Sequence, residues 1–553
     1  MRKTVLAILG AALASPAWAQ SAIEAYNLSQ TQLRGTARFM SMGGAFTALG
    51  GDLSTLGQNP AGIGVYRRSE IGVTLDISPS SFKTDGGVKY DPSLGLKNPQ
   101  SKTTVACNNF GYIGAVRLDG PLRNFNWGVS YSRAASFDRV FDAYTPSTST
   151  SLSNYIASYT TAAAYGNPGF TPDDLNFPES GSYNPYQAPE GYDWLSILAY
   201  TSSMIAPPQY SGGPYTGLYQ PGRTVGDALT KVRERGYVDE YNIDFGGNVS
   251  DVVYWGLGFG ITDLSYTREA LYSESMSNAQ VDVNGHLTDG AANFDLYNNQ
   301  HITGSGWNMK LGVIVKPVNE LRIGLAVHTP TWYDLSQSGY ATTDYDYAEM
   351  DYTKPQPEVV GDPLSGSQHT DDSYYNFKLN APWRFMVGVA GVIGSQAIIS
   401  LDYERQAFGD MKVKYQNGWG EYLDDDYVNG DIKDYFKATD IIRVGAEYRV
   451  TPNFSVRAGY NYSTTNVKEE AADGATEIFT AGTNPAYTFN KEAYSISCGL
   501  GYRYRGFSID AAYVYHNRKS TYHAFTNYDG LQAPQSSLSQ TTNSIVLSVG
   551  YRF

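Results

Sequence analysis

Residues that could carry out chemistry are few and scattered along this chain. The glycine-rich run Gly256-Leu257-Gly258-Phe259-Gly260 lies inside a segment of alternating polarity, not between a strand and a helix, so it does not form a nucleotide-binding loop. No arrangement of serine, histidine and an acidic residue stands out, which argues against a lipase. We therefore predict no enzyme activity, no catalytic residue, no metal and no cofactor. The six histidines, no two of which have metal-ligand spacing on one element, are His286, His301, His328, His369, His516 and His523.

Composition and charge narrow the class of protein further. The 553 residues carry a net charge of −14, which argues against nucleic acid as a partner. Aromatic residues make up 14% of the chain, and 46 of them are tyrosines. Of the two cysteines, strand parity places Cys498 outward and Cys107 inward, on strands that are not neighbours. We therefore expect no structural disulfide.

The first nineteen residues have the features of an export signal. Met1-Arg2-Lys3 is a positively charged start, Val5–Ala14 is apolar, and Ala17-Trp18-Ala19 supplies a cleavage pattern of small residues. No later stretch approaches the ~20 apolar residues that a membrane-spanning helix needs. We predict a signal peptide at residues 1–19 and a mature, exported chain that begins at Gln20.

Apolar and polar residues alternate in short segments from Ile71 to the last residue, which is the period of a β-strand. About fourteen segments have the length of a tilted membrane strand, and bacterial barrels have even strand numbers. Short links alternate with long ones, as expected when one rim carries tight periplasmic turns and the other carries extracellular loops. We predict an all-β fold, a transmembrane antiparallel β-barrel of about 14 strands at residues 67–553. The long connections are residues 79–103, 134–236, 266–300, 330–379, 406–437, 463–491 and 516–542.

The opposite parity of these segments carries the charges. A polar interior with apolar residues outside is the inverse of a soluble core, so the interior holds water, substrate or a plug. The inward charged residues are Lys310, Arg322, Arg384, Asp402, Glu404, Arg443, Glu447, Arg457, Arg503, Asp510 and Arg552.

A glycine-rich, nearly uncharged stretch at Gly35–Gly64 precedes the alternating segments. Its close pairs Gly43-Gly44 and Gly50-Gly51 allow sharp turns and close backbone packing. We interpret residues 20–66 as a hatch, or plug, held inside the barrel. An ordinary mobile linker is the alternative that composition leaves open.

The insert at residues 134–236 is too long for a simple loop. It contains the apolar run Trp194–Tyr200 followed by Met204-Ile205, and Pro207-Pro208 ends this region. We expect a short helix on the outer face that exposes an apolar patch, and this patch would be the first binding site of a hydrophobic ligand. Packing within the large loop is an equally weighted alternative. The candidate ligand-contacting residues here are Trp194, Leu195, Ile197, Leu198 and Met204.

Several patches resemble the FadL/TodX family of outer-membrane transporters for hydrophobic compounds. Asn59-Pro60-Ala61-Gly62 is similar to part of the N-terminal hatch of that family. Arg322–Pro330 looks like a second family segment, and Asn380-Ala381-Pro382-Trp383 is similar to the entry of the strand that follows it. Further hatch positions that match are Gly35, Ala37-Arg38, Gly43-Gly44-Ala45 and Asp52.

The resemblance implies passive uptake of hydrophobic small molecules, long-chain fatty acids or similar, across the outer membrane of a Gram-negative bacterium. A ligand would land between extracellular loops, enter the barrel and leave sideways through a gap near the third strand. The movable end would be Gln20–Glu24, and Arg384 or Arg443 would meet a carboxylate, unless they form ion pairs within the lumen. The implied hatch and gate residues are Gln20, Ser21, Gly35, Arg38, Gly43, Gly44, Asn59, Pro60 and Ala61.

Other functions stay open at this stage. A general porin would need an open pore, a surface adhesin would use the tyrosine-rich loops, and some relatives of this family are labelled hemin receptors. No histidine here stands out as a haem ligand. We expect a monomer whose partners are outer-membrane lipid and a hydrophobic small molecule.

Overall fold

The computed structural model describes residues 21–553 except 86–89, 92–94, 168, 179–182, 284 and 395. The predicted signal peptide and Gln20 lie outside the described residues.

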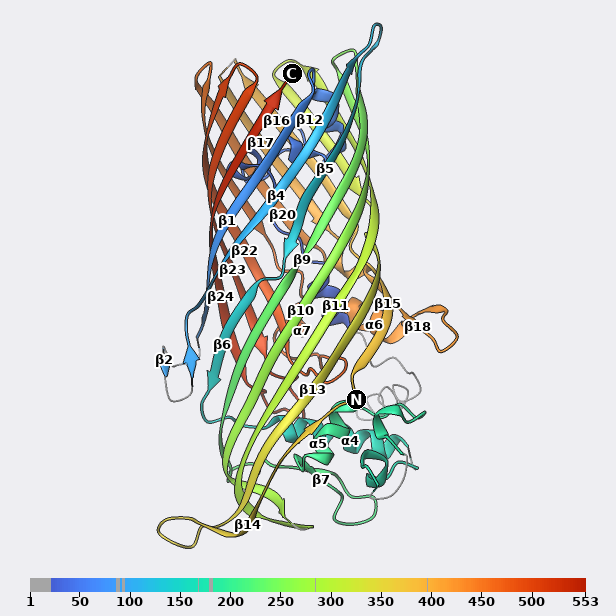
Figure 1. The fold of residues 1–553 in the computed structure, drawn as a ribbon, viewed down its shortest axis with the longest axis vertical. Coiled ribbons are helices and arrows are strands. Elements are labelled where there is room, and N and C mark those ends of the chain that lie inside the picture. Colours follow the sequence, from blue (N-terminus) through green and yellow to red (C-terminus); the bar gives the residue numbers. More distant parts are fainter. Residues whose placement is uncertain are drawn as a thin grey trace.

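One antiparallel sheet closes on itself to form the barrel (Figure 1). The first strand, β1 (Glu70–Thr84), pairs with β4 (Gln100–Arg117) on one side and with the last strand, β24 (Gln535–Arg552), on the other. The predicted barrel of fourteen antiparallel strands is therefore confirmed. Between β4 and β24 the wall runs through β5 (Leu122–Ser136), β9 (Val225–Val249), β10 (Val253–Val283), β11 (His286–Val318), β12 (Leu321–His328), β16 (Arg384–Ile393), β17 (Ala397–Gln406), β20 (Thr439–Thr451), β21 (Phe454–Ser463), β22 (Tyr487–Tyr504) and β23 (Phe507–His523).

The barrel is apolar outside and polar inside, as the alternation predicts. Leu75, Leu257 and Leu311 on the outer face are 53%, 44% and 59% exposed, whereas inward Lys310 and Asp402 are buried. Among the described residues, no helix is long and apolar enough to cross a membrane. Lipid can cover such an outer belt because closure pairs the strand edges that hydrocarbon would otherwise leave without hydrogen bonds.

Several strands continue well beyond the apolar belt at the end with long connections. The pairing of β10 with β11 runs from Val253↔Val315 to Val283↔His286, so the prediction of a long loop at residues 266–300 is wrong. The outer face of this extension lies beyond the lipid and its inner face packs against the loops. The apolar alternation of the sequence therefore fades although the backbone pairing continues. Further strands at this end are β6 (Arg139–Thr145), β13 (Trp332–Asp351), β14 (Glu358–His369), β15 (Ser373–Asn380), β18 (Lys412–Gln416) and β19 (Tyr422–Asp424).

Most helices of the connections also lie at the long-loop end (Figure 1). The predicted short helix in the 134–236 insert is present as α5 (Trp194–Thr201), but the expectation that it exposes an apolar patch is wrong. Its apolar side chains are buried in a cluster with α4 (Leu152–Gly166), because the insert folds its apolar residues inward. The remaining elements are β2 (Tyr90–Asp91), β3 (Leu96–Lys97), η3 (Pro172–Leu175), η4 (Pro185–Gln187), β7 (Ile205–Ala206), β8 (Thr216–Gly217), η5 (Phe408–Asp410), α6 (Asp426–Tyr435) and α7 (Glu469–Ala472).

Residues 21–66 lie inside the barrel and are called the plug below (Figure 1). The segment folds into α2 (Ala22–Leu28), α3 (Ala37–Ser41), η1 (Leu53–Thr55) and η2 (Pro60–Val65). Helix α2 lies toward the long-loop end, next to α6, whereas η2 lies against β9, β10 and β11 near their short turns. The chain then passes directly into β1.

A bulge in β4 corrects one parity prediction. Thr74 of β1 pairs with Asn109, but Leu75 pairs with Cys107, so Asn108 is an extra residue in β4. Cys107 therefore faces the same side as outward Leu75, and its predicted inward orientation is wrong. Cys107 and Cys498 are both free.

Candidate functional site

Glycines of the barrel wall receive the backbone of the plug. A Cβ at Gly256 would overlap the carbonyl of Pro60, and a Cβ at Gly312 would overlap the side chain of Asn59. Gly459 of the wall faces Gly43 of the plug in the same way. Because glycine has no side chain, the plug lies directly against the wall at these points. This close contact fixes the plug at Gly43 and at Asn59–Ala61.

Polar groups anchor the same part of the plug. Arg38 Nε lies 2.9 Å from Glu447 Oε2, and the Thr47 backbone N–H donates to Asp402 Oδ2 at 2.7 Å. Asn59 caps η2 by accepting from the Ala61 N–H at 3.1 Å, and its amide donates to the Thr47 carbonyl at 2.6 Å. Five of the predicted hatch residues thus contact residues of the barrel wall. The five are Arg38, Gly43, Asn59, Pro60 and Ala61, while Gly35 and Gly44 form turns with positive φ in the plug.

Helix α2 is held in a different way, by aromatic packing. The Tyr26 ring is stacked on Phe436, with centroids 4.6 Å apart, and its edge meets Phe489 at 6.3 Å. Ser21 caps the helix by accepting from the Ile23 N–H at 3.2 Å, and the Ser21 N–H donates to Glu24 at 2.9 Å. Burial raises the pKa of the Glu24 carboxyl, although the hydrogen bonds from Ser21 oppose this shift.

The apolar space around α2 is called the α2 chamber. Its walls consist of buried side chains from the barrel strands toward the long-loop end and from the loops. Helix α2 fills the space with Ile23, Tyr26 and Leu28. The residual cavity beside Ile23 and Glu24 measures only about 10 Å³, which is no more than the space for one water molecule. A second cavity, beside Leu28, measures about 80 Å³, so among the described residues a molecule as large as a long acyl chain fits in this chamber only if α2 moves. The chamber walls include Leu264, Tyr266, Ile302, Leu335, Phe408, Phe436 and Phe489.

The backbone pairing of the wall is interrupted between β4 and β5. The ladder between these strands ends at Asn109↔Ser132, and β5 has a register shift between Arg133 and Ala135. In the part of the chain that the structure describes, Gln100–Asn108 has no backbone partner on this side, although its other side pairs with β1. We call this stretch, together with residues 136–145 opposite it, the wall gap.

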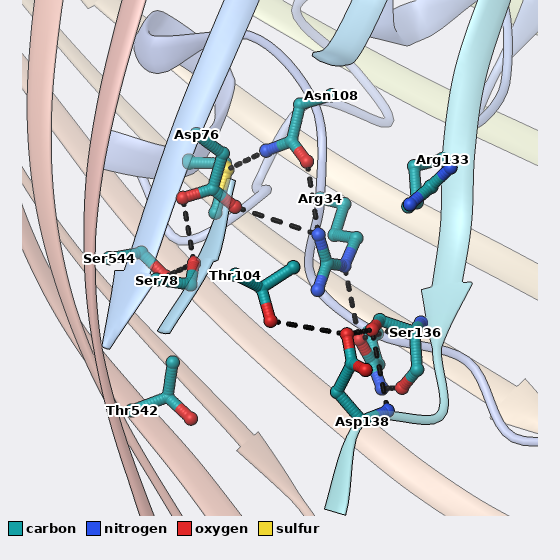
Figure 2. A network of polar contacts seen from close by, with 12 residues as sticks. Arg34, Asp76, Ser78, Thr104, Asn108, Arg133, Ser136, Asp138, Thr542 and Ser544 are labelled. Atoms are coloured by element: carbon teal, nitrogen blue, oxygen red, sulfur yellow. Dashed lines mark hydrogen bonds and ion pairs between the residues drawn. The ribbon is translucent and has the colours of Figure 1, made fainter. Parts of the chain in front are cut away.

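Side chains, not backbone groups, connect the two sides of the wall gap. Lys102 forms an ion pair with Asp138. Thr104 Oγ1 donates to Asp138 Oδ2 at 3.1 Å (Figure 2). Gln100 donates to Asp142 Oδ2 at 2.8 Å. Such contacts break and reform more readily than a strand ladder, since each is a single polar interaction at a partly exposed site.

A segment of the plug closes the wall gap from inside. Arg34 Nη1 donates to Asn108 Oδ1 at 3.1 Å and lies 3.5 Å from Asp76 Oδ2 (Figure 2). Gln32 donates to the Ser136 carbonyl at 2.7 Å and accepts from Arg34 Nε at 3.0 Å. Sequence reasoning missed both plug residues. Their one signal was position: Arg34 is the charged residue immediately before the predicted hatch glycine Gly35.

The predicted ligand residues do not form one site. Arg384 Nε lies 2.7 Å from Glu404 Oε1 and Arg443 Nη2 lies 2.5 Å from Glu404 Oε2, so the lumen ion pair is the arrangement present. The predicted ligand residues of α5 lie in the loop core and not beside these arginines, and among them Trp194 is partly buried, against Tyr186. The fully buried members of that set are Leu195, Ile197, Leu198 and Met204.

The histidines have local partners. His328 Nε2 lies 2.8 Å from the Gln58 carbonyl, and the His523 ring stacks on Tyr487 with centroids 4.7 Å apart. Across the described residues, no group of three or more histidine, cysteine or acidic side chains is arranged to hold a metal ion.

Fold and interior together define a transmembrane β-barrel that its own N-terminal segment plugs. No protein-family model and no curated protein matches the sequence. Solved structures with a similar fold include a Pseudomonas aeruginosa FadL homologue, which is 14% identical, with 95% of this chain and 99% of that chain covered and a TM-score of 0.49. The Pseudomonas putida toluene transporter TodX is 14% identical (95% and 100% covered, TM-score 0.43). The Ralstonia pickettii toluene transporter TbuX is also 14% identical (96% and 100% covered, TM-score 0.44).

Proposed function

We propose that this protein carries hydrophobic small molecules, long-chain fatty acids or compounds of similar character, passively across the outer membrane of a Gram-negative bacterium. The observation that carries the proposal is the short connection between two features of the plug. Helix α2 fills an apolar chamber, and only three residues separate its end at Leu28 from Gln32, which closes the wall gap. Occupation of the chamber and closure of the wall are thereby linked.

The first step is entry of the ligand from the long-loop end, which faces the outside of the cell. The ligand takes the place of Ile23, Tyr26 and Leu28 in the α2 chamber. Burial of its chain is worth about 0.8 kcal/mol for each CH₂ group, so a long acyl chain matches the apolar contacts that α2 gives up. The part of the plug that moves is α2 together with its Ser21–Glu24 end, since it lacks the glycine contacts that hold Gly43 and Asn59–Ala61.

The second step is lateral release. Displacement of α2 pulls on Gln32 and Arg34, and the wall gap then opens where no backbone ladder has to be broken. Exit through the wall delivers the ligand to lipid and keeps it out of bulk water. Movement down a concentration gradient needs no energy source, in line with the absence of a nucleotide-binding motif in the sequence.

The proposal is tested with the full chain in a Gram-negative host from which its own fatty-acid transporter has been deleted. Expression of the wild-type protein is expected to restore uptake of radiolabelled oleate, and mass spectrometry of the purified protein is expected to find bound lipid. Uptake that stays at the level of the empty host, with no bound lipid, would contradict the proposal and favour an adhesin. Large steady currents through the protein in a planar bilayer would instead indicate a general porin.

A further inference from the structure

A recess of about 330 Å³ lies between the plug and the wall at the short-turn end of the barrel. Its plug side is formed by Leu49–Gly51 and by Val65–Arg68, the link to β1. Seven of the lining side chains are arginines, and the only lining carboxylate among the described residues is Glu447. We call this space the arginine recess.

Some of these arginines have acidic partners. Arg38 shares Glu447 with Arg457, at 2.9 Å and 2.6 Å, and Arg457 also pairs with Asp510. Arg552 lies 2.5 Å from a Glu70 oxygen, and Arg67 lies 2.5 Å from Asp251. These carboxylates fix four guanidinium groups and neutralise their charge.

Three further arginines of the lining, Arg68, Arg322 and Arg503, have no acidic partner among the described residues. In the described part of the chain, Arg503 and Arg68 form no ion pair or side-chain hydrogen bond, and Arg322 binds only the Leu49 carbonyl, at 2.7 Å. Arg322 Nε is buried without a partner. A second kind of unused donor lies in the same lining: the hydroxyl of Tyr66, a residue only 4% exposed, has no hydrogen-bond partner. Arg449 adds a further positive charge to the lining.

This concentration of positive charge is unusual for the molecule. The chain as a whole carries a net charge of −14, so general attraction to acidic partners does not explain the recess. Unpaired guanidinium groups close together repel one another, and a buried donor without a partner is unfavourable. An anion in the space relieves the repulsion between the guanidinium groups.

We propose that the arginine recess binds a phosphate-type oxyanion at the short-turn end of the barrel. Guanidinium groups match phosphate oxygens with paired hydrogen bonds. A phosphate group presents acceptor oxygens in several directions, so it can bind more than one guanidinium group of the lining, such as those of Arg503 and Arg322, whereas a planar carboxylate offers only two oxygens. The donor of this group is either free phosphate or a phospholipid headgroup. The site does not depend on the proposed uptake.

Isothermal titration of the full-length protein in a neutral detergent tests the site. The two probes are inorganic phosphate and a short-chain phosphatidylglycerol, each at constant ionic strength set with chloride. Saturable binding of one probe is expected, and the probe that binds identifies the source of the anion. Arg503→Gln is expected to weaken it roughly tenfold or more, because a charged hydrogen bond is lost.

Arg322→Gln serves as a second variant, and Arg235→Gln, at an exposed position of β9 far from the recess, is the matched control that should bind like the wild type. Arg503 forms no ion pair in the described chain, so its replacement is not expected to disturb folding, and the heat-modifiable shift of the barrel in gel electrophoresis checks this. Absence of saturable binding of both probes would overturn the proposal. Equal binding by the wild type and by Arg503→Gln and Arg322→Gln would overturn it too.

Discussion

The ring of Tyr26 in the plug lies parallel to that of Phe436, with planes 4° apart and centroids separated by 4.6 Å. Phe436 directly follows α6 in a loop of the long-loop end, so this stack joins α2 of the plug to the loops at that end. Stacked aromatic pairs contribute about 0.5–1.5 kcal/mol beyond the area they bury. In the proposed uptake, the Tyr26–Phe436 stack is a contact that a ligand entering the α2 chamber has to break.

Replacement of Tyr26 by alanine is expected to release α2. Removal of a large buried aromatic side chain costs roughly 3–5 kcal/mol, and here the loss falls on a helix of only seven residues. Hydrogen exchange followed by mass spectrometry should show faster exchange at residues 22–28 and unchanged exchange in η2. Tyr26→Phe is the control, because it keeps the stack and loses only the hydrogen bond from the Asn490 N–H, worth about 1 kcal/mol. Equal protection of α2 in wild type and Tyr26→Ala would show that the stack does not hold the helix.

Gly256→Ala is expected to displace the plug from the wall at Pro60. The new Cβ would overlap the Pro60 carbonyl, and overpacking of this kind costs about 1–3 kcal/mol. Planar-bilayer recordings should show frequent openings that the wild type lacks. The matched control is Gly391→Ala in β16, where a Cβ meets no atom within 4 Å. If both variants stay closed, the glycine contacts are not what seats the plug.

The loop helix α5 is expected to gain stability on mild acidification. Asp193 caps this helix by accepting from the Leu195 and Ser196 N–H groups, yet burial raises its pKa from 3.8 to about 6. Because the folded form binds the proton more tightly than the unfolded form, the contribution is fully present below about pH 4. It is lost as pH rises through about 6, by up to about 1.4 kcal/mol for each pH unit.

The measurement for this prediction is the hydrogen-exchange protection of residues 194–201 between pH 4 and pH 7, corrected for intrinsic exchange rates. Asp193→Asn keeps a good capping residue and removes the charge, so its protection should be independent of pH in this window. Asp193→Ala should lose about 1 kcal/mol at every pH. A wild-type helix that becomes less protected on acidification would contradict the sign argued here.

The strands within the membrane could be predicted from the sequence because lipid imposes a strict rule. Every second residue of a strand faces hydrocarbon and must be apolar, and Leu257 and Leu311 obey this rule along their strands. Beyond the apolar belt this rule no longer applies. The sequence therefore predicts loops where β10 and β11 have paired extensions. The bulge at Asn108 limits the prediction in a second way. One extra residue reverses every side-chain orientation that is assigned by counting from one end of a strand.

The candidate site was less accessible from the sequence, because alternation reports which side a residue faces and not whether its backbone is paired. The wall gap is a property of pairing. Gln32 and Ser136 are 104 positions apart, and neither local sequence predicts their contact. The apolar run Trp194–Tyr200 shows a similar limit: its composition predicts burial against something, and the loop core provides that partner in place of a ligand.

A cross-link across the wall gap is expected to stop uptake. Thr104 of β4 and Asp138 on the opposite side are joined by a side-chain hydrogen bond of 3.1 Å, so a short thiol cross-linker between cysteines at these positions would hold the gap closed. The double variant T104C/D138C is made in a background that lacks the two free thiols, C107S/C498S. Uptake of labelled oleate should fall to the level of the empty host after cross-linking with a reducible reagent and recover after reduction.

The control for this experiment uses the other side of the same strand. Ser78 of β1 pairs with Thr104 in an intact ladder, so the cross-linked variant S78C/T104C ties together strands that do not need to part. Its uptake should match that of the untreated protein, which separates closure of the gap from general stiffening of the barrel. Full uptake by the cross-linked T104C/D138C protein would mean that the ligand leaves by another route. The plug segment at Gln32 and Arg34 would then be a structural seal and not part of a gate.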